Sequence, residues 1–203
     1  MSKGMLIVIS GPSGVGKGTI GNEILKRHKE NTCFSVSATT RKIRPGEKEG
    51  VHYFYKTKEE FNRMIENDEF LEYMQVFGKD SYGTPRSFVE EKRNAGFNVL
   101  LDIDVKGAMK VKANCPDALL IFIAPPSFAE LRQRLVLRAT ESKEAVERRL
   151  AEAGTEMSYM SKYDYVVVND VLKDAVDTVE LILKSAENSP LYKADLVASL
   201  KAD

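Results

Sequence analysis

The chain has 203 residues, of which 43% are hydrophobic, so it is long enough for one sizeable domain with its own core. Thirty basic residues balance thirty acidic ones, and a chain without net charge has no overall attraction to nucleic acid or to an anionic membrane. The longest apolar run (118–126) is too short to cross a bilayer, no signal-peptide core is visible, and the two cysteines stand in no metal-binding spacing, so we expect a cytoplasmic protein with reduced, buried thiols.

A glycine-rich segment near the N-terminus carries the most specific motif. Residues 5–9 are apolar and predict a buried strand, and apolar residues recur at helical spacing from Ile20 onwards. Between them, four residues separate Gly11 from Gly16 and Lys17. This is the spacing of a P-loop, in which backbone N–H groups surround nucleotide phosphates and the lysine reaches the outer ones. An ordinary glycine-rich turn is the alternative, but the order of strand, loop and helix favours a phosphate site.

The residue after Lys17 departs from the usual P-loop pattern. Gly18 stands where most P-loops have a serine or threonine whose hydroxyl ligates Mg²⁺, and Thr19 follows one place later. We therefore expect the ion to be held mainly by nucleotide phosphates and water, with protein carboxylates in support.

A polar segment over residues 38–50 follows the first helix, which should end near Lys29, and a short strand over residues 33–37. The segment has no periodicity, and it holds Arg41 and Arg44, three residues apart. Two arginines among hydroxyl-bearing and flexible residues suit bidentate contacts with a phosphate. A solvated loop is the alternative, since exposed arginines are common.

The next elements alternate between strands and helices. They are a strand over 52–55, a helix from the capping box at Thr57 to about Asn67, a strand over 70–76, a turn over 81–85 and a helix over 86–95 ended by Gly96. Glu72 lies inside the strand 70–76, flanked by Leu71 and Tyr73. It should face a polar partner or solvent, and the residues alone favour an exposed strand face.

The apolar run over residues 98–104 ends in two carboxylates. Asp102 and Asp104 are two residues apart, which places them on the same side of a strand at its C-terminal end, where ligands bind in open α/β sheets. In a chain with a P-loop, such an aspartate is typical of a metal site. The alternative is that Asp104 only caps the helix that begins at Val105. Asp102 lies too deep in the strand to cap, so it is the expected support for the metal, directly or through water.

Two further apolar strands are expected, over residues 118–124 and 165–168, both buried. Between them, one helix opens at Ser127 and a second ends near Tyr159, and both carry arginines that would close on a polyphosphate. A charged face paired with glutamates is the alternative. A helix over 172–185 and a weakly amphipathic tail follow. Short apolar strands that alternate with helices predict an α/β protein, a three-layer fold with a mostly parallel sheet.

These segments together resemble the guanylate kinase family of the nucleoside monophosphate kinases. The resemblance covers nearly the whole chain, and its most specific stretches are 35–44, 46–47, 50–53, 70–72, 82–84, 101–104 and 122–126. It implies a P-loop fold made of a core (1–36, 94–126 and 159–203), an inserted GMP-binding region (37–93) and a helical lid (127–158).

The resemblance also implies a role for each candidate site residue. ATP would be bound by Gly11, Pro12, Ser13, Gly14, Val15, Gly16, Lys17, Gly18 and Thr19, with Asn169 near the adenine end. The GMP phosphate would be held by Arg41, Arg44, Tyr53 and Tyr82, and the guanine by Ser37, Glu72, Thr84 and Asp104. Lys17, Arg134, Arg138 and Arg149 would supply positive charge for catalysis. The stretch before Tyr82 is a residue longer than in some members, which leaves residues 79–81 unplaced.

The implied reaction moves the γ-phosphoryl group of MgATP to GMP and gives ADP and GDP. Such a transfer needs position and positive charge more than a covalent nucleophile. The expected partners are these small molecules, with no nucleic acid or membrane, and the oligomeric state is left open. A kinase for another monophosphate should lack Ser37 together with Glu72, and a non-enzymatic scaffold should have lost Lys17 and the lid arginines.

Overall fold

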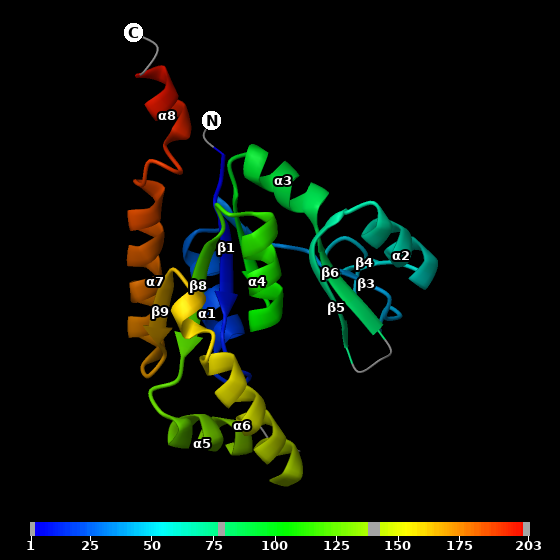
Figure 1. The fold of residues 1–203 in the computed structure, drawn as a ribbon, viewed down its shortest axis with the longest axis vertical. Helices are drawn as coiled ribbons and strands as arrows, with labels where there is room; N and C mark the ends of the chain where they lie inside the picture. Colours follow the sequence, from blue (N-terminus) through cyan, green and yellow to red (C-terminus); the bar gives the residue numbers. More distant parts are fainter. Residues whose placement is uncertain (1–2, 77–79, 138–142, 201–203) are drawn as a thin grey trace.

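The computed structural model of the protein describes residues 3–76, 80–137 and 143–200. A parallel sheet of five strands forms its centre, in the order β2-β7-β1-β8-β9. Figure 1 labels three of these strands, β1, β8 and β9. Its strands are β1 (Leu6–Ser10), β2 (Thr32–Phe34), β7 (Asn98–Asp102), β8 (Leu119–Ala124) and β9 (Tyr165–Val168). Helices α1 (Lys17–Arg27) and α7 (Leu172–Glu187) cover one face, and α4 (Val105–Asn114) with part of α3 (Arg86–Asn94) covers the other. The predicted three-layer α/β fold is confirmed.

The central strand β1 shows why the layers form. Ile7 packs with Ile20 of α1 in one hydrophobic cluster, whereas its neighbour Leu6 packs with Val111 of α4 in the other, and all four side chains are fully buried. Successive side chains of a strand point to opposite faces. A strand that is covered on both faces must therefore be apolar at every position, as this one is.

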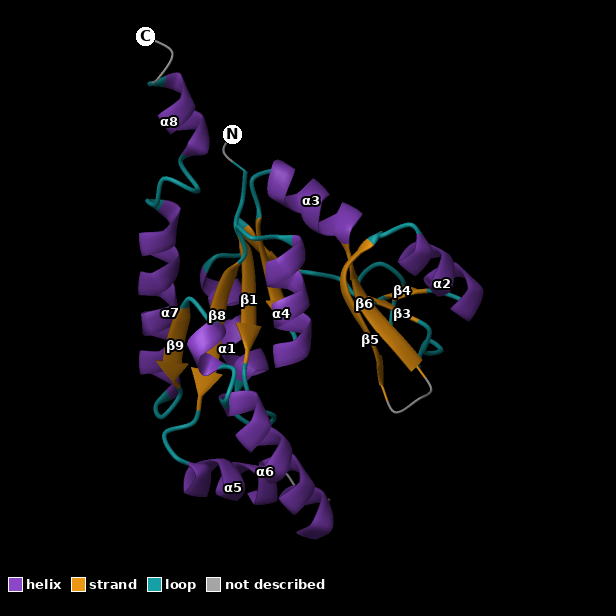
Figure 2. Cartoon of the chain, viewed as in Figure 1, coloured by secondary structure: helices purple, strands orange, loops and turns teal. Residues whose placement is uncertain are grey.

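A second sheet lies beside the first and is joined to it through α3 (Figure 2). Its strands lie in the order β4-β3-β6-β5, namely β3 (Ala38–Thr39), β4 (Phe54–Tyr55), β5 (Phe70–Val76) and β6 (Asp80–Pro85). Helix α2 (Lys58–Glu66) packs on it through Phe61. The predicted capping box is present, because Thr57 Oγ1 accepts from the Glu60 N–H at 3.1 Å and Glu60 Oε2 accepts from the Thr57 N–H at 2.7 Å.

The prediction of a turn over residues 81–85 is wrong, because these residues belong to β6, which pairs with β5 in the antiparallel sense. Gly83 is required by packing rather than by a turn, since a Cβ there would lie 2.8 Å from Cδ1 of the Phe70 ring. Pro85 ends the strand, where a missing N–H costs no ladder bond. Residue 79 lies outside the described residues.

The prediction that β9 is buried is also wrong. Tyr165, Val166 and Val168 are exposed, and only Val167 packs into the core. The strand lies at the edge of the sheet, so it has a paired neighbour, β8, on one side only. Smaller differences are that α1 ends at Arg27, that residues 35–37 leave the parallel sheet on the way to β3, and that the two free cysteines are only half-buried.

Helices α5 (Phe128–Leu137) and α6 (Lys143–Met157) pack against each other beyond the carboxyl ends of β1 and β8 (Figure 1). The predicted break between them, at residues 139–143, falls mostly outside the described residues. A short 3₁₀ helix, η1 (Met160–Lys162), leads into β9, and α8 (Ala194–Ser199) follows α7. In the described part of the chain, no helix has both the length and the apolar character that a membrane span requires.

Candidate active site

The loop between β1 and α1 has the backbone of a phosphate cradle. Gly11 and Gly16 have φ angles of 140° and 98°, which other residues rarely adopt. A side chain at Gly11 would also collide with the carbonyl oxygen of Ile123 in β8. Gly16 directly precedes α1, so the N–H groups of the first helical turn, which have no acceptor within the helix, lie at the loop.

Lys17 is the first residue of α1, and its side chain folds back over this loop. Its Nζ donates to the carbonyl oxygen of Gly11 at 2.7 Å and to that of Pro12 at 3.0 Å. These bonds hold the ammonium group at the carboxyl end of β1. A phosphate in the cradle would therefore meet a positive charge that is already in place.

Asn169, expected near the adenine end, lies behind the loop. Its side chain is buried, and its Nδ2 donates to the carbonyl oxygen of Val15 at 2.8 Å. A Cβ on Gly16 would lie 2.5 Å from the same nitrogen, so the loop and the asparagine are in close contact. A contact between Asn169 and adenine stays a prediction.

Asp102 ends β7 beside the start of α1, where a Cβ on Gly18 would lie 3.3 Å from its Oδ2. Asp102 is exposed at the end of β7, but partial desolvation of its carboxylate by the surrounding protein raises its pKa, and the nearby Lys17 ammonium lowers it. No three potential ligands of the His, Cys, Asp and Glu types gather anywhere in the described part of the chain. One carboxylate beside a phosphate cradle fits a Mg²⁺ ion that is carried by nucleotide phosphates and water.

Glu72 and Thr84 face each other across β5 and β6. Thr84 Oγ1 donates to Glu72 Oε1 at 2.7 Å. Thr84 is 0% exposed and Glu72 is 7% exposed. Burial raises the pKa of Glu72, and the Thr84 hydroxyl opposes this shift. The other oxygen, Oε2, points towards α4, because a Cβ on Gly107 would lie 3.3 Å from it. The exposed-face alternative for Glu72 is therefore excluded.

Asp104 does cap α4, since its Oδ1 accepts from the Gly107 N–H at 2.8 Å. It also borders a cavity of about 470 Å³ that separates the four-stranded sheet from α6. The lining residues are Met74, Asp104, Val105, Lys106, Glu152, Thr155, Glu156 and Tyr159. The capping role and a place at a ligand cavity thus coexist.

Three of the four residues expected at the acceptor phosphate lie together. The guanidinium carbon of Arg41 is 5.3 Å from the centroid of the Tyr53 ring, and the Tyr53 and Tyr82 rings are 5.8 Å apart. Arg44 is in the same segment with an exposed side chain. Ser37 is partly buried just before β3, and its carbonyl oxygen accepts from the Phe54 N–H at 2.9 Å.

The arginines of the helical pair have separate surroundings. Arg134 Nη1 donates to the backbone oxygen of Asn169 at 2.8 Å, and its Nε donates to Glu130 at 2.9 Å, so α5 is tied to the end of β9. Arg149 is half-buried on α6. Arg138 lies outside the described residues.

Two glutamates beside the site have no role in the sequence analysis. Glu156 of α6 borders the large cavity. Burial is the main effect that raises the pKa of Glu156, and the Lys17 ammonium and the backbone of Ser13 in the glycine loop help to lower it. Glu47 contacts Arg41. Neither could be chosen by spacing, because each is one of several glutamates in its segment.

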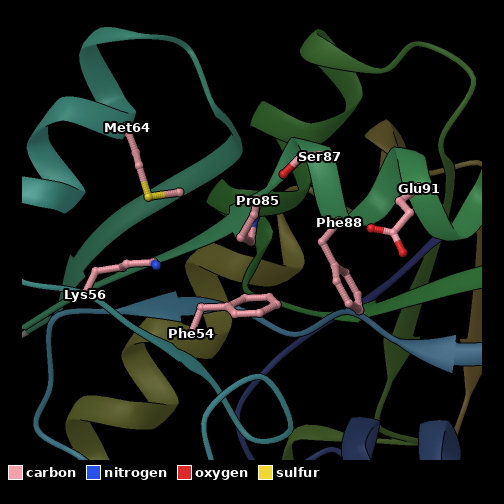
Figure 3. Close-up of a pocket in the computed structure, with 7 residues that line it drawn as sticks. All are labelled: Phe54, Lys56, Met64, Pro85, Ser87, Phe88 and Glu91. Carbon is pink, nitrogen blue, oxygen red and sulfur yellow. The ribbon is translucent and has the colours of Figure 1, made fainter.

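A smaller cavity, of about 240 Å³, lies between α2 and α3 (Figure 3). Its lining residues are Phe54, Lys56, Met64, Pro85, Ser87, Phe88 and Glu91. The Phe54 and Phe88 rings meet edge to face across it, 5.7 Å apart. The lining includes no predicted site residue, so this cavity is separate from the candidate active site.

Comparison with known proteins gives one family. The family model for guanylate kinase matches residues 3–186. A guanylate kinase of Oceanobacillus iheyensis is 51% identical over 183 residues, which cover 90% of this chain and 88% of the relative. One of Clostridium perfringens is 50% identical over 182 residues, which cover 90% and 83%. The crystal structure of guanylate kinase from Anaplasma phagocytophilum is 38% identical, with a TM-score of 0.71 over 94% of this chain and 90% of that one. The family match thus includes every element that carries the site.

Proposed function

Because the chain belongs to the guanylate kinase family, we propose that it transfers the γ-phosphoryl group of ATP to GMP and releases ADP and GDP. The observation that carries the choice of GMP is the buried Glu72 carboxylate, which accepts from Thr84 and is close enough to Asp104, a residue that lines the large cavity, for the two charges to interact. A carboxylate that is taken out of water needs hydrogen-bond donors, of which Thr84 supplies one and a ligand would supply more. Guanine supplies two of them on one edge.

The guanine base would be recognised by the polarity of that edge. Its N1–H and N2 amino groups would donate to Glu72, while the Ser37 hydroxyl would donate to O6. Thr84 would orient Glu72, and Asp104 would add a second carboxylate near the amino group. A base with the opposite polarity would leave a buried charge without donors.

The acceptor phosphate would be held by Arg41, Arg44, Tyr53 and Tyr82. One of its oxygens is already ionised at neutral pH, so no general base is required for its attack on the γ-phosphorus. As the new O–P bond forms, the bond between the γ-phosphorus and the β–γ bridging oxygen breaks, and ADP leaves with that oxygen. In-line placement of acceptor and donor is the main contribution of these side chains.

The donor would lie in the glycine loop, residues 11–19, with its phosphates against the backbone N–H groups and Lys17. Lys17, Arg134, Arg138 and Arg149 would stabilise the charge that spreads over the transferring group. Asn169 would act through the loop that it holds. Closing α5 and α6 over the nucleotides would exclude water, which would otherwise accept the phosphoryl group.

The family also implies Mg²⁺, and the residues present fit it in a supporting role. When bound, the ion neutralises charge on the β- and γ-phosphate oxygens. Asp102 would hold it directly or through water, because Gly18 offers no hydroxyl. We further place the enzyme in the cytoplasm, where its two free cysteines would stay reduced.

A coupled assay of ADP release tests the proposal, with GMP, AMP, UMP and dTMP as acceptors at saturating ATP. We expect GMP-dependent release, with the other acceptors lower by up to roughly 10⁴-fold. The Lys17→Met variant serves as a control for contaminating kinases. Equal rates with GMP and AMP, or release of ADP that does not depend on any acceptor, would contradict the proposal.

A further inference from the structure

Glu47 lies at the centre of the segment that carries the two acceptor-site arginines. Its Oε1 accepts from Arg41 Nη2 at 2.7 Å, and its Oε2 accepts from Arg41 Nη1 at 3.1 Å. The same Oε2 accepts from the Arg44 backbone N–H at 2.8 Å and from the Tyr55 hydroxyl at 2.7 Å. The Arg41 and Glu47 side chains are 11% and 18% exposed, so this bidentate pair is largely shielded from water.

The pair uses one particular edge of the guanidinium. A guanidinium has five N–H groups, and three of those of Arg41 are engaged by Glu47 and by the Lys42 carbonyl oxygen, at 2.9 Å. The other two, on Nε and Nη2, form a second fork of the kind that binds phosphate in a bidentate way. The Tyr53 ring lies 5.3 Å from the carbon of the same guanidinium, and the Tyr82 ring lies 5.8 Å from the Tyr53 ring. Glu47 therefore fixes the plane of Arg41 from one edge, and the second fork lies on the adjacent edge, which shares Nη2 with the first.

We propose that Glu47 is a positioning residue of the acceptor site, which holds Arg41 so that its second fork faces the 5′-phosphate of GMP. The proposal rests on the proposed function, in which Arg41 binds that phosphate. An arginine that is not held must be ordered when the ligand binds, which weakens affinity. Charge alone predicts the opposite result, because removing a carboxylate beside an anion site should strengthen the binding of an anion. Positioning and charge thus give opposite signs for one measurement.

The experiment compares Glu47→Ala and Glu47→Gln with wild type. Glutamine keeps the shape but turns an amide N–H towards the guanidinium, so it serves as a second variant if alanine fails to fold. We expect the KM for GMP to rise by roughly ten- to hundredfold, while kcat at saturating GMP and the KM for ATP stay within about twofold. The Kd of guanosine, which has no phosphate, should not change in calorimetry.

Glu49 provides the matched control. It carries the same charge two residues further on, and its Oε2 accepts from the Tyr55 N–H at 2.9 Å rather than from an arginine. Glu49→Gln should leave the KM for GMP within about twofold of wild type. Adding Glu47→Ala to Arg41→Ala should also have little effect beyond that of Arg41→Ala, because Glu47 acts through the arginine.

The outcomes separate this proposal from the proposed function. If Arg41→Ala raises the KM for GMP but Glu47→Ala lowers it or leaves it unchanged, Glu47 is not a positioning residue, and the kinase function stands. If guanosine binding weakens as much as GMP binding, Glu47 supports the whole sheet and the proposal is wrong. If Arg41→Ala itself leaves the KM for GMP unchanged, the acceptor site of the proposed function is misplaced.

Discussion

Gly18 stands directly against the carboxylate of Asp102, since a Cβ on the glycine would lie 3.3 Å from Asp102 Oδ2. Gly18, which occupies the position that usually supplies a metal-binding hydroxyl, is therefore next to a carboxylate at the end of strand β7. Thr19, one residue further, is exposed. A carboxylate is the stronger ligand for Mg²⁺, so Asp102 should matter more to the metal than Thr19 does.

We predict that Asp102→Asn weakens the dependence of activity on Mg²⁺ more than Thr19→Val does. The asparagine keeps the shape but loses the charge that attracts the ion. Activity is measured against free Mg²⁺ at fixed ATP, and the midpoint should move to higher Mg²⁺ for the aspartate variant. A curve that moves for the threonine variant and not for the aspartate variant would show that the ion is held elsewhere.

Lys17→Met should lower kcat by at least about tenfold, because a charge on the transferring phosphate is lost from a site that excludes water. Methionine retains the apolar stem, so the variant should still fold, but the carbonyl oxygens of Gly11 and Pro12 lose a donor and the midpoint of urea unfolding should fall. Lys26→Met is the matched control on the same helix, where the ammonium group pairs with Glu23 at the surface, at 2.6 Å. More than a tenth of wild-type kcat in the Lys17 variant would contradict the role given to the loop.

Asn169→Ala should destabilise the protein by about 1–3 kcal/mol, because the buried carbonyl oxygen of Val15 loses its donor. The loop should loosen as well, so the KM for ATP should rise more than the KM for GMP. Asn188→Ala is the control, since that side chain donates to the Lys184 carbonyl oxygen at 2.8 Å on an exposed helix end. Equal urea midpoints for wild type and the Asn169 variant would rule out the supporting role.

Glu72→Gln should stabilise the protein at neutral pH. Burial raises the folded-state pKa of Glu72 above the ordinary value of 4.5, so the ionised carboxylate lowers stability at pH values above 4.5. Below that value the side chain is protonated in both states and the penalty disappears. Thr84 can still donate to the glutamine oxygen. The difference in unfolding midpoint between variant and wild type should therefore be positive near pH 7.5 and shrink as the pH falls. A difference that is negative at neutral pH, or that does not vary with pH, would contradict this.

Much of the fold follows from local sequence signals. The apolar run of β1, the capping box at Thr57 and the strand over residues 70–76 are each decided by neighbouring residues, and all were predicted. The prediction of a turn over residues 81–85 is wrong because Gly83 is required by its close packing against the Phe70 ring, thirteen residues away in sequence, and not by a turn. The prediction that β9 is buried is wrong because the order of the strands in the sheet cannot be deduced from the sequence. An edge strand needs apolar residues on one face only.

The site divides in the same way. The glycine loop could be read from spacing, whereas the burial of Glu72 depends on Thr84 of the next strand. The approach of Glu156 to the glycine loop depends on how α6 packs, and the hydrogen bonds between Glu47 and Arg41 depend on how a segment without periodicity folds back. Contacts of this kind are determined by tertiary structure, so no pattern of residue types in the sequence predicts them.

The choice of GMP as acceptor rests on Glu72, and one measurement tests it most directly: kcat/KM for GMP and for AMP with wild type and with Glu72→Gln. Guanine presents two donors to the carboxylate, whereas adenine sets the lone pair of N1 against it. Glutamine replaces one acceptor with a donor, so we expect kcat/KM for GMP to fall by at least about 10²-fold, with AMP gaining relative to GMP. A fall by the same factor for both nucleotides, or no fall for either, would show that Glu72 does not read the base.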